Sequence, residues 1–239
     1  GLSEWKGKSG CFVPEGTVRL VLQTGREEEL LGVAENLKGA WKSLTGYEAE
    51  VVTGTEDSLG KGDIYLGFAD SSLGLKAEKQ QGLIWGAGTL MQLLEKAEEG
   101  EGGIPCGLIR DYPRYAVRGF AIDIGRKMVS MDTLKQIVLY MSENKMNNLG
   151  IHLNDNEILS TSGKNDSIAN AFTAYAGFRL ESETRNKKGE GITSQDGALT
   201  KEEWKEFTRW AEEKGVQVVP EIDTPAHSLA ITRVFPEYA

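Results

Sequence analysis

The order of apolar and polar residues divides the chain into two stretches with different periodicities. In the first, a short apolar run at 18–22 precedes a segment whose apolar residues recur at helical spacing, at Leu30, Leu31, Ala34, Leu37, Trp41 and Leu44. This pattern predicts a strand followed by an amphipathic helix that ends at Gly46. Further strands are predicted from Val51 and at 63–68, and a second helix at 82–96. The first stretch is therefore an α/β layer.

A segment rich in glycine, proline and acidic residues, EKAEEGEGGIPCGLIRDYPRY, follows this layer. Such composition is typical of a linker, so a domain boundary is predicted near Asp111. The expected organisation is an N-terminal α/β domain at 1–112 and a second domain at 113–239.

The second stretch alternates apolar runs with amphipathic segments. The predicted elements are a strand at 117–124, a helix at 132–146 capped by Asp132, a strand at 149–153, a helix at 201–214 in which Thr200 and Glu203 form a capping box, and a fully apolar strand at 216–222. Apolar strands that alternate with helices are typical of a parallel sheet, either doubly wound or closed as a (β/α)8 barrel.

Polar residues lie at or just beyond the C-terminal ends of the three predicted strands: Asp123, then His152, Asn154 and Asp155, then Glu221, Asp223 and His227. In a (β/α)8 barrel that face carries the active site. The predicted fold is therefore α/β, a small N-terminal domain followed by the first three βα units of a barrel.

Composition and motifs exclude several classes of function. The formal net charge is -9 and no basic run is visible, which argues against nucleic acid as a partner. No segment approaches the roughly 20 apolar residues of a membrane span. The first strand of the second domain is followed by neither GxGxxG nor GxxxxGK[ST], so no nucleotide cofactor is expected.

Cysteine and histidine are scarce. Two of each are present, too few at ligand spacing for a metal cluster, and no metal is expected. A disulfide framework is excluded, while Cys11 and Cys106 could form one bridge or remain buried thiols.

Four ordered segments resemble glycoside hydrolase family 20: VRGFAIDIGRKM at 117–128, NKMNNLGIHLNDNE at 144–157, VVPEIDTPAHSLA at 218–230, and the junction-like GLIWGAGTLMQLL at 82–94 with RDYPRYAVRG at 110–119. The resemblance implies a retaining hydrolase without a cofactor that releases β-linked N-acetylhexosamine, in which the sugar's own acetamide oxygen attacks the anomeric carbon. It also implies a glycan substrate with a terminal N-acetylhexosamine. A bacterial protein, secreted or on the cell surface, is expected, with its leader removed.

The family's adjacent Asp-Glu pair, which supplies the general acid and orients the acetamide, follows the fourth barrel strand. No such pair follows a predicted barrel strand here. A whole barrel takes about 250 residues, so the remainder is expected in further sequence or in a separate chain, and residues 1–239 alone are expected to be inactive.

Two further features depart from the family pattern. Near residue 78 only LKAEKQ stands where relatives carry a β-hairpin, so the hairpin is absent or the sequence joins across a gap. An irregular insertion at 158–197 contains AYAGFRLESET, which is similar to the lacto-N-biosidase branch, whose enzymes release a disaccharide. The leaving unit is therefore left open between N-acetylhexosamine and lacto-N-biose.

The resemblance assigns roles to particular residues. Asp155 and His227 form a relay that supports the general acid. Arg118 donates two hydrogen bonds to sugar hydroxyls, or else forms an ion pair with an acid such as Asp123. Asp223 and Glu221 contact sugar or brace the missing pair, and loop residue Asn156 is a further candidate for substrate binding.

The remaining candidates are given structural roles. His152 lies within a strand and is expected in the core, while Asp123 and Arg126 are expected to form a buried ion pair. The tryptophans are interpreted as packing residues. Two other functions stay open: a non-catalytic glycan-binding protein on the same fold, and an unrelated barrel enzyme acting on a phosphorylated metabolite.

Overall fold

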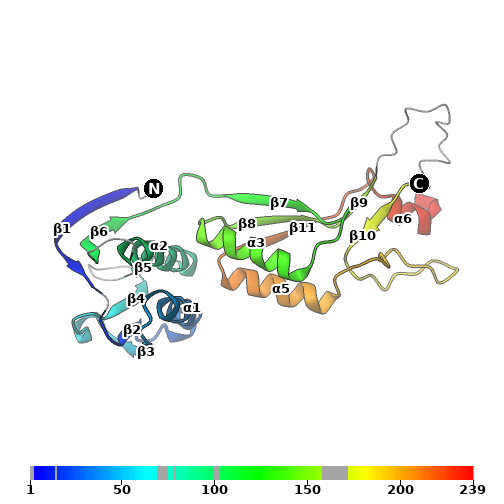
Figure 1. The fold of residues 1–239 in the computed structure, drawn as a ribbon. Coiled ribbons are helices and arrows are strands. Elements are labelled where there is room, and N and C mark those ends of the chain that lie inside the picture. The colour runs from blue at the N-terminus through cyan, green and yellow to red at the C-terminus, as the bar shows by residue number, and fades with distance from the viewer. Residues whose placement is uncertain are drawn as a thin grey trace. The chain divides into compact units, whose positions relative to one another are not determined.

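The computed structural model describes residues 3–13, 15–68, 75–77, 79–98, 103–157 and 172–238. The chain divides into two compact units, Gly1–Ala116 and Val117–Ala239. Figure 1 shows both, and each is described by itself.

The first unit is a parallel sheet with two helices. Strands β2 (Val18–Gln23), β3 (Ala49–Gly54), β4 (Ile64–Phe68) and β5 (Leu75–Ala77) lie in the order β3-β2-β4-β5. Helices α1 (Glu27–Thr45) and α2 (Gln80–Glu98) contact each other and the sheet, and a short 3-10 helix, η1, spans Glu56–Ser58. Together the sheet and helices enclose one apolar core. The predicted α/β layer is confirmed.

Helix α1 shows how sequence fixes this unit. Leu30, Leu37 and Trp41 are fully buried or nearly so, and Gly46 ends the helix in the left-handed conformation with a φ of 71°. A residue with a side chain is strained there, which explains the glycine. Leu31 is the exception to the prediction, because it lies on the solvent face with 48% of its surface exposed.

A two-stranded antiparallel ribbon completes the first unit. Strand β1 (Glu4–Phe12) pairs with β6 (Ile104–Arg110), and the latter lies inside the segment predicted to be a linker. Part of this segment is therefore regular structure, because glycine-rich composition does not prevent a ribbon from pairing. Cys11 and Cys106 are both free thiols, so the alternative of a bridge is not realised.

The second unit contains three βα-type strands in one parallel sheet. Strands β7 (Gly119–Asp123), β8 (Asn148–His152) and β11 (Gln217–Glu221) lie in the order β11-β8-β7. Helices α3 (Met131–Glu143) and α5 (Lys201–Glu213) contact each other and share one apolar core with the sheet. In Figure 1 both helices lie on the same side of the strands. Sequential neighbouring strands with all helices on one face are the arrangement expected for the start of a (β/α)8 barrel.

Caps define the two helices. Thr200 and Glu203 form the predicted capping box on α5. For α3 the predicted cap is wrong: Ser130 is the N-cap and its Oγ accepts a hydrogen bond from the Thr133 amide at 3.1 Å. Asp132 lies one residue inside the helix, where its charge favours the N-terminal dipole.

Beyond the sheet, short elements carry the chain over the strand ends. Strand β9 (Asn154–Asn156) pairs with β10 (Ala176–Phe178), and helix α6 (Leu229–Val234) and a 3-10 helix, η2 (Pro236–Tyr238), follow β11. Part of the predicted insertion, 158–171, lies outside the described residues, as do 69–74 and 78, where the family hairpin is in question.

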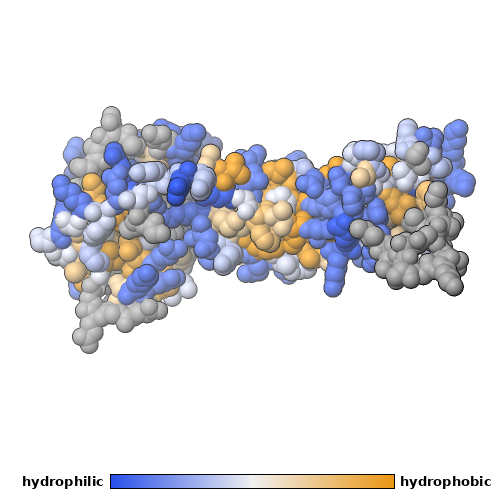
Figure 2. All heavy atoms as spheres, turned by 90° about the horizontal axis from the view of Figure 1, so that it is seen from above, coloured by the Kyte–Doolittle hydropathy of each residue, from blue (hydrophilic) through white to orange (hydrophobic). Residues whose placement is uncertain are grey.

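The face of this sheet opposite α3 and α5 is open within the described residues. Val219 of β11 pairs with Gly150, whose neighbours Leu149 and Ile151 face the helices, so Val219 lies on the opposite face, and it is 39% exposed. Figure 2 shows apolar surface over this part of the molecule. Nothing among the described residues covers this face.

The tryptophans follow their predicted role in part. Trp41 is fully buried, and Trp204 and Trp210 pack against the core of the second unit. Trp5 is 47% exposed on β1, so it is not a core residue. Among the described residues, no helix combines the length and apolar character that crossing a bilayer requires.

Candidate active site

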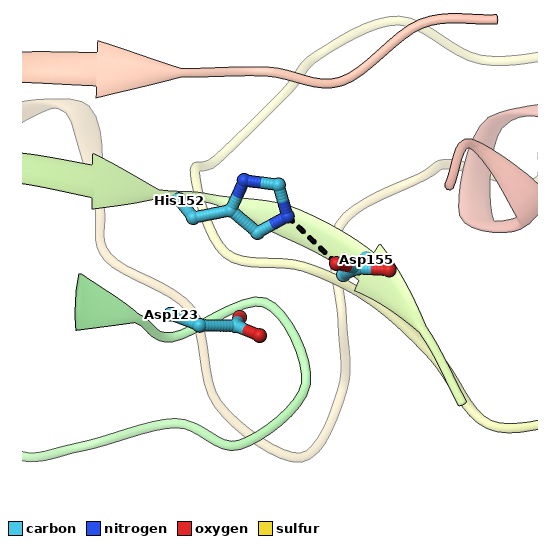
Figure 3. A group of neighbouring side chains, drawn as sticks. All are labelled: Asp123, His152 and Asp155. Carbon is cyan, nitrogen blue, oxygen red and sulfur yellow. Dashed lines mark hydrogen bonds and ion pairs between the residues drawn. The ribbon is translucent and has the colours of Figure 1, made fainter. Parts of the chain in front are cut away.

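The last residues of the three parallel strands form a row across the sheet. In the strand register, Asp123 of β7 lies opposite His152 of β8, and His152 lies opposite Glu221 of β11. Leu149 and Ile151 of the same strand are fully buried against the helices, so alternation places His152 on the open face. Figure 3 shows Asp123 and His152 together with Asp155 of strand β9.

Asp155 is the centre of the site, with a side chain only 2% exposed. Its Oδ1 accepts from the Asn156 amide at 2.6 Å and meets His227 Nδ1 at 2.7 Å, while its Oδ2 meets Arg126 Nη1 at 2.7 Å and His152 Nε2 at 2.8 Å. Burial alone would raise the pKa of Asp155, but these hydrogen bonds and the Arg126 charge outweigh it and lower that pKa. Asp155 is therefore an anion with every acceptor position engaged.

His227 is held by Asp155 in one tautomer. Its Nδ1 lies 2.7 Å from Asp155 Oδ1 but 3.4 Å from Arg126 Nη2. Because an anionic acceptor at the shorter distance forms the stronger bond, Nδ1 carries the proton and donates to Asp155. The other nitrogen, Nε2, is then the one that can meet a further group.

The backbone of His227 is strained, with a φ of 53° at a residue that carries a side chain. Such a conformation costs about 1–3 kcal/mol and persists only when the surroundings impose it. Asn154, fully buried, supplies that support. Its Nδ2 donates to the carbonyls of Asp223 at 3.1 Å and His227 at 3.2 Å, and its Oδ1 accepts from the Asp223 amide at 2.8 Å. Sequence analysis gave Asn154 no role.

His152 does not fill the predicted core position. Its Nδ1 meets Glu221 Oε1 and its Nε2 meets Asp155 Oδ2, so both ring nitrogens contact carboxylates. Burial would lower the pKa of His152, but the hydrogen bonds to Glu221 and Asp155 and the charge of Asp123 outweigh burial and raise it. The sequence signal for this role is that three neighbouring parallel strands each end in a polar residue, which places His152 between two acids.

Arg118 lies away from this cluster. It immediately precedes β7, whose first residue pairs with the first residue of β8, and its Nε donates to the Lys145 carbonyl at 2.7 Å. That is the N-terminal end of the strands, and Arg118 is five residues, or about 16 Å of extended chain, from Asp123. Asp123 forms its ion pair with Arg126, and the sugar contact of Arg118 stays a prediction.

Arg126 lies at the C-terminal ends of the strands, just after β7. Its Nη1 lies 2.7 Å from both Asp123 Oδ2 and Asp155 Oδ2. The predicted ion pair with Asp123 is confirmed, although it is not buried: the two side chains are 40% and 33% exposed. The guanidinium therefore keeps donors available to a ligand.

The other two candidates for substrate binding contribute backbone groups. Asn156 donates its amide to Asp155. Asp223 lies beyond the end of β11, so strand alternation does not fix its side chain, and its amide and carbonyl both bind Asn154.

A buried arginine in the insertion was missed. Arg179 has a side chain 1% exposed, and its Nε donates to the Ile124 carbonyl at 2.9 Å. Its Nη1 donates to Asp196 Oδ1 and to the Gly197 carbonyl, both at 2.8 Å, and its Nη2 donates to the Tyr175 hydroxyl. Arg179 thus ties the insertion to the turn that carries Arg126. No spacing in the sequence pointed to this role.

Asp123, His152 and Asp155 also place three ligand atoms within 4.8 Å of one another, a separation compatible with a metal ion. The spacing of cysteine and histidine in the sequence does not indicate this group, because two of its three members are aspartates. Arg126 already supplies a positive charge to both carboxylates. The donor set is therefore better explained as an ion-pair network than as a metal centre.

Comparison with known proteins follows the same two units. The family model for the family 20 glycosyl hydrolase catalytic domain matches residues 115–239, and the model for domain 2 of the same family matches residues 2–112. A β-hexosaminidase of Akkermansia muciniphila is 36% identical over 162 residues, which is 66% of this chain and 30% of that protein. A β-hexosaminidase of Vibrio furnissii is 28% identical over 200 residues, 83% of this chain and 32% of that protein.

Solved structures agree. A mutant β-hexosaminidase of Streptomyces plicatus in complex with its product GlcNAc matches with a TM-score of 0.71 and 25% identity, over 98% of this chain and 47% of that one. The β-N-acetylhexosaminidase of Bacteroides fragilis shares the fold, with a TM-score of 0.70 and 22% identity over 99% of this chain and 47% of that one. The chain spans about a third of the length of these curated relatives and about half of these solved structures. Both units match the same family in its own domain order, and the chain belongs to glycoside hydrolase family 20.

Proposed function

We propose that this protein removes β-linked N-acetylhexosamine, or the disaccharide lacto-N-biose, from the non-reducing ends of glycans. Family membership and the relatives named β-hexosaminidase support the reaction class. The observation that carries the proposal is the Asp155–His227 pair, joined at 2.7 Å beside the ends of the parallel strands. A substrate glycan would be the partner.

The proposed reaction is retaining and substrate-assisted. The acetamide oxygen of the sugar attacks the anomeric carbon, the glycosidic C–O bond breaks, and a general acid protonates the leaving oxygen; water then opens the intermediate. This differs from the two-carboxylate scheme, because the second carboxylate orients the acetamide and forms no bond to carbon. We assign both groups to an Asp-Glu pair outside residues 1–239, in further sequence or in a separate chain.

Residues of this chain would support that chemistry. With Nδ1 bound to Asp155, His227 presents Nε2 to the general acid and can stabilise its ionised form. Arg126, at the strand ends and 40% exposed, offers N–H donors to sugar hydroxyls. Asn156 and Asp223 stay candidates for substrate contact on the neighbouring loops. A location outside the cell stays a prediction.

The test is turnover by the full-length protein. We expect release of the chromophore from a β-N-acetylglucosaminide, a β-N-acetylgalactosaminide or a lacto-N-bioside, with retained configuration in the first-formed product by NMR. The substrate that is cleaved identifies the leaving unit. Binding of these glycans without turnover would instead support a non-catalytic glycan-binding protein, and neither binding nor turnover would contradict the proposal.

A further inference from the structure

His152 occupies the middle position of an acidic row. Asp123 and Glu221 are its paired residues on the two neighbouring strands, and Asp155 reaches it from β9. The His152 side chain is 15% exposed, whereas that of Glu221 is 66% exposed. The imidazole is therefore largely shielded from water while three carboxylates surround it.

The hydrogen bonds of His152 require a proton on both nitrogens. Nε2 lies 2.8 Å from Asp155 Oδ2, and Nδ1 contacts Glu221 Oε1. A neutral imidazole has one N–H, so its bare nitrogen would face a carboxylate oxygen unless that carboxylate were protonated. Asp155 cannot easily take that proton, since four donors already engage it.

We propose that Glu221 and His152 form a second arm of the relay, in which Glu221 keeps His152 doubly protonated and His152 holds Oδ2 of Asp155. Asp155 thereby stays an anion whose Oδ1 fixes the tautomer of His227. This assigns Glu221 a positioning role in place of a sugar contact. The inference rests on the proposed function and adds two positioning residues to it.

Electrostatics explain why the second arm matters. Two cations, Arg126 and His152, contact Oδ2 of Asp155, and the ring of His227 contacts Oδ1. Two positive neighbours lower the basicity of Asp155, so the Nδ1 proton of His227 stays on the ring and Nε2 remains the nitrogen that meets the acid. If His152 lost its proton, a lone pair would face a carboxylate, and Asp155 would keep three of its four donors with one fewer positive neighbour on Oδ2.

The charged groups that contact this chain of bonds come from every neighbouring element: Asp123 from β7, Arg126 from the turn after it, Asp155 from β9, Glu221 from β11 and His227 from the segment before α6. Three are acids, Arg126 is a permanent cation, and His227 is joined through Asp155. Loss of any one acid therefore makes the proton on His152 easier to remove.

The test is the pH dependence of the full-length protein carrying Glu221→Gln. Glutamine keeps an acceptor for Nδ1 but removes the charge, so His152 should deprotonate at lower pH. We expect the alkaline limb of the kcat profile to move down by about one pH unit, within the range for loss of one close opposite charge. The KM for the chromogenic substrate should change less than about threefold, a difference of about 0.7 kcal/mol.

Glu212→Gln on the outer face of α5 is the matched control and should leave the profile unchanged. His152→Gln should abolish the effect of adding Glu221→Gln, because both act through one proton. A KM raised more than about tenfold with an unmoved profile would show a sugar contact and overturn the proposal, as would independent effects in the double variant.

A second measurement separates this proposal from the proposed function. NMR titration of labelled histidine in the full-length protein, with the His152 signal assigned from His152→Gln, should show that signal titrating at lower pH in Glu221→Gln. This holds whether or not the protein cleaves a glycan. An unchanged His152 titration would overturn the second arm even in an active enzyme, whereas a shifted titration in an inactive protein would refute only the reaction.

Discussion

At the scale of single residues, Asn154 shows how a buried amide can control a loop. Its side chain makes three hydrogen bonds to the backbone of Asp223 and His227, and one of them holds the strained His227 carbonyl. Asn154→Leu would leave these groups buried and unpaired, which costs about 1–3 kcal/mol. We expect that loss in denaturant unfolding, with a kcat lowered at least tenfold in the full-length protein.

Two comparisons make the Asn154 test specific. Asn144→Leu, at the exposed C-cap of α3, should cost under about 0.5 kcal/mol. If Asn154 acts through His227, adding Asn154→Leu to His227→Ala should lower kcat little further. Multiplicative losses in that double variant would show that Asn154 is only structural.

Arg118 and Arg126 lie at opposite ends of the strands, so the same substitution in each makes a matched comparison. Arg126→Gln removes the charge shared by Asp123 and Asp155, whereas Arg118→Gln removes a bond to the Lys145 carbonyl at the far end of the strands. We expect Arg126→Gln to lower kcat/KM by at least about a hundredfold, or about 2.7 kcal/mol. Arg118→Gln should lower thermal stability while active molecules keep their KM. The reverse outcome would restore Arg118 to the sugar site.

Ionisation of this site should give the protein a stability maximum at mildly acidic pH. The pKa of Asp155 is lowered, so its contribution exists above about pH 4 and is lost as pH falls through its folded value. The pKa of His152 is raised, so its contribution exists below about pH 6.5 and is lost as pH rises through its folded value. Melting temperatures of wild type and His152→Gln, measured from pH 3 to 9, should differ most below pH 6.5. A difference independent of pH would contradict this.

At the scale of elements, close packing of two glycines sets the turn that carries Arg126. A Cβ on Gly125 would lie 2.7 Å from the backbone of Asn154 and Asp155, and one on Gly177 would overlap the Gly125 carbonyl. Backbone atoms cannot move aside cheaply, so Gly125→Ala should cost about 1–3 kcal/mol and reduce activity. Gly39→Ala, in α1 with no atom within 4 Å of the added Cβ, should instead stabilise by about 0.5–1 kcal/mol. Equal effects of the two substitutions would refute this account.

Elements with strong periodicity were predictable and those held by distant contacts were not. Helix α5 and its capping box follow from local spacing, and the Asp155–His227 pair follows from two motifs. Ribbon β1–β6 joins residues about a hundred positions apart, so no local pattern marks it. The same holds for Arg118 and Arg126: motif similarity indicates a segment, whereas only strand register shows which of its two arginines lies at the C-terminal end.

At the scale of the whole molecule, the open face of the β11-β8-β7 sheet points to a covering segment. Apolar side chains on its edge strands are partly exposed, and among the residues that the structure describes no strand pairs with the outer edges of β7 and β11. The catalytic-domain match spans residues 115–239, against about 250 residues for a whole barrel. We propose that the rest of the barrel covers this sheet and that it also brings the acid and the acetamide-orienting carboxylate.

Residues 1–239 produced without any further sequence test this proposal. We expect no turnover of the chromogenic β-N-acetylglucosaminide or lacto-N-bioside, because Asp155 and His227 position an acid but cannot replace it. The open face should bind an apolar dye and promote self-association, and Val219→Thr, on a side chain 39% exposed, should weaken both. Mixing with the remaining barrel, supplied as a separate chain, should suppress dye binding and restore turnover together. Activity from residues 1–239 alone would show that the acid lies within them and would refute the proposed division of the site.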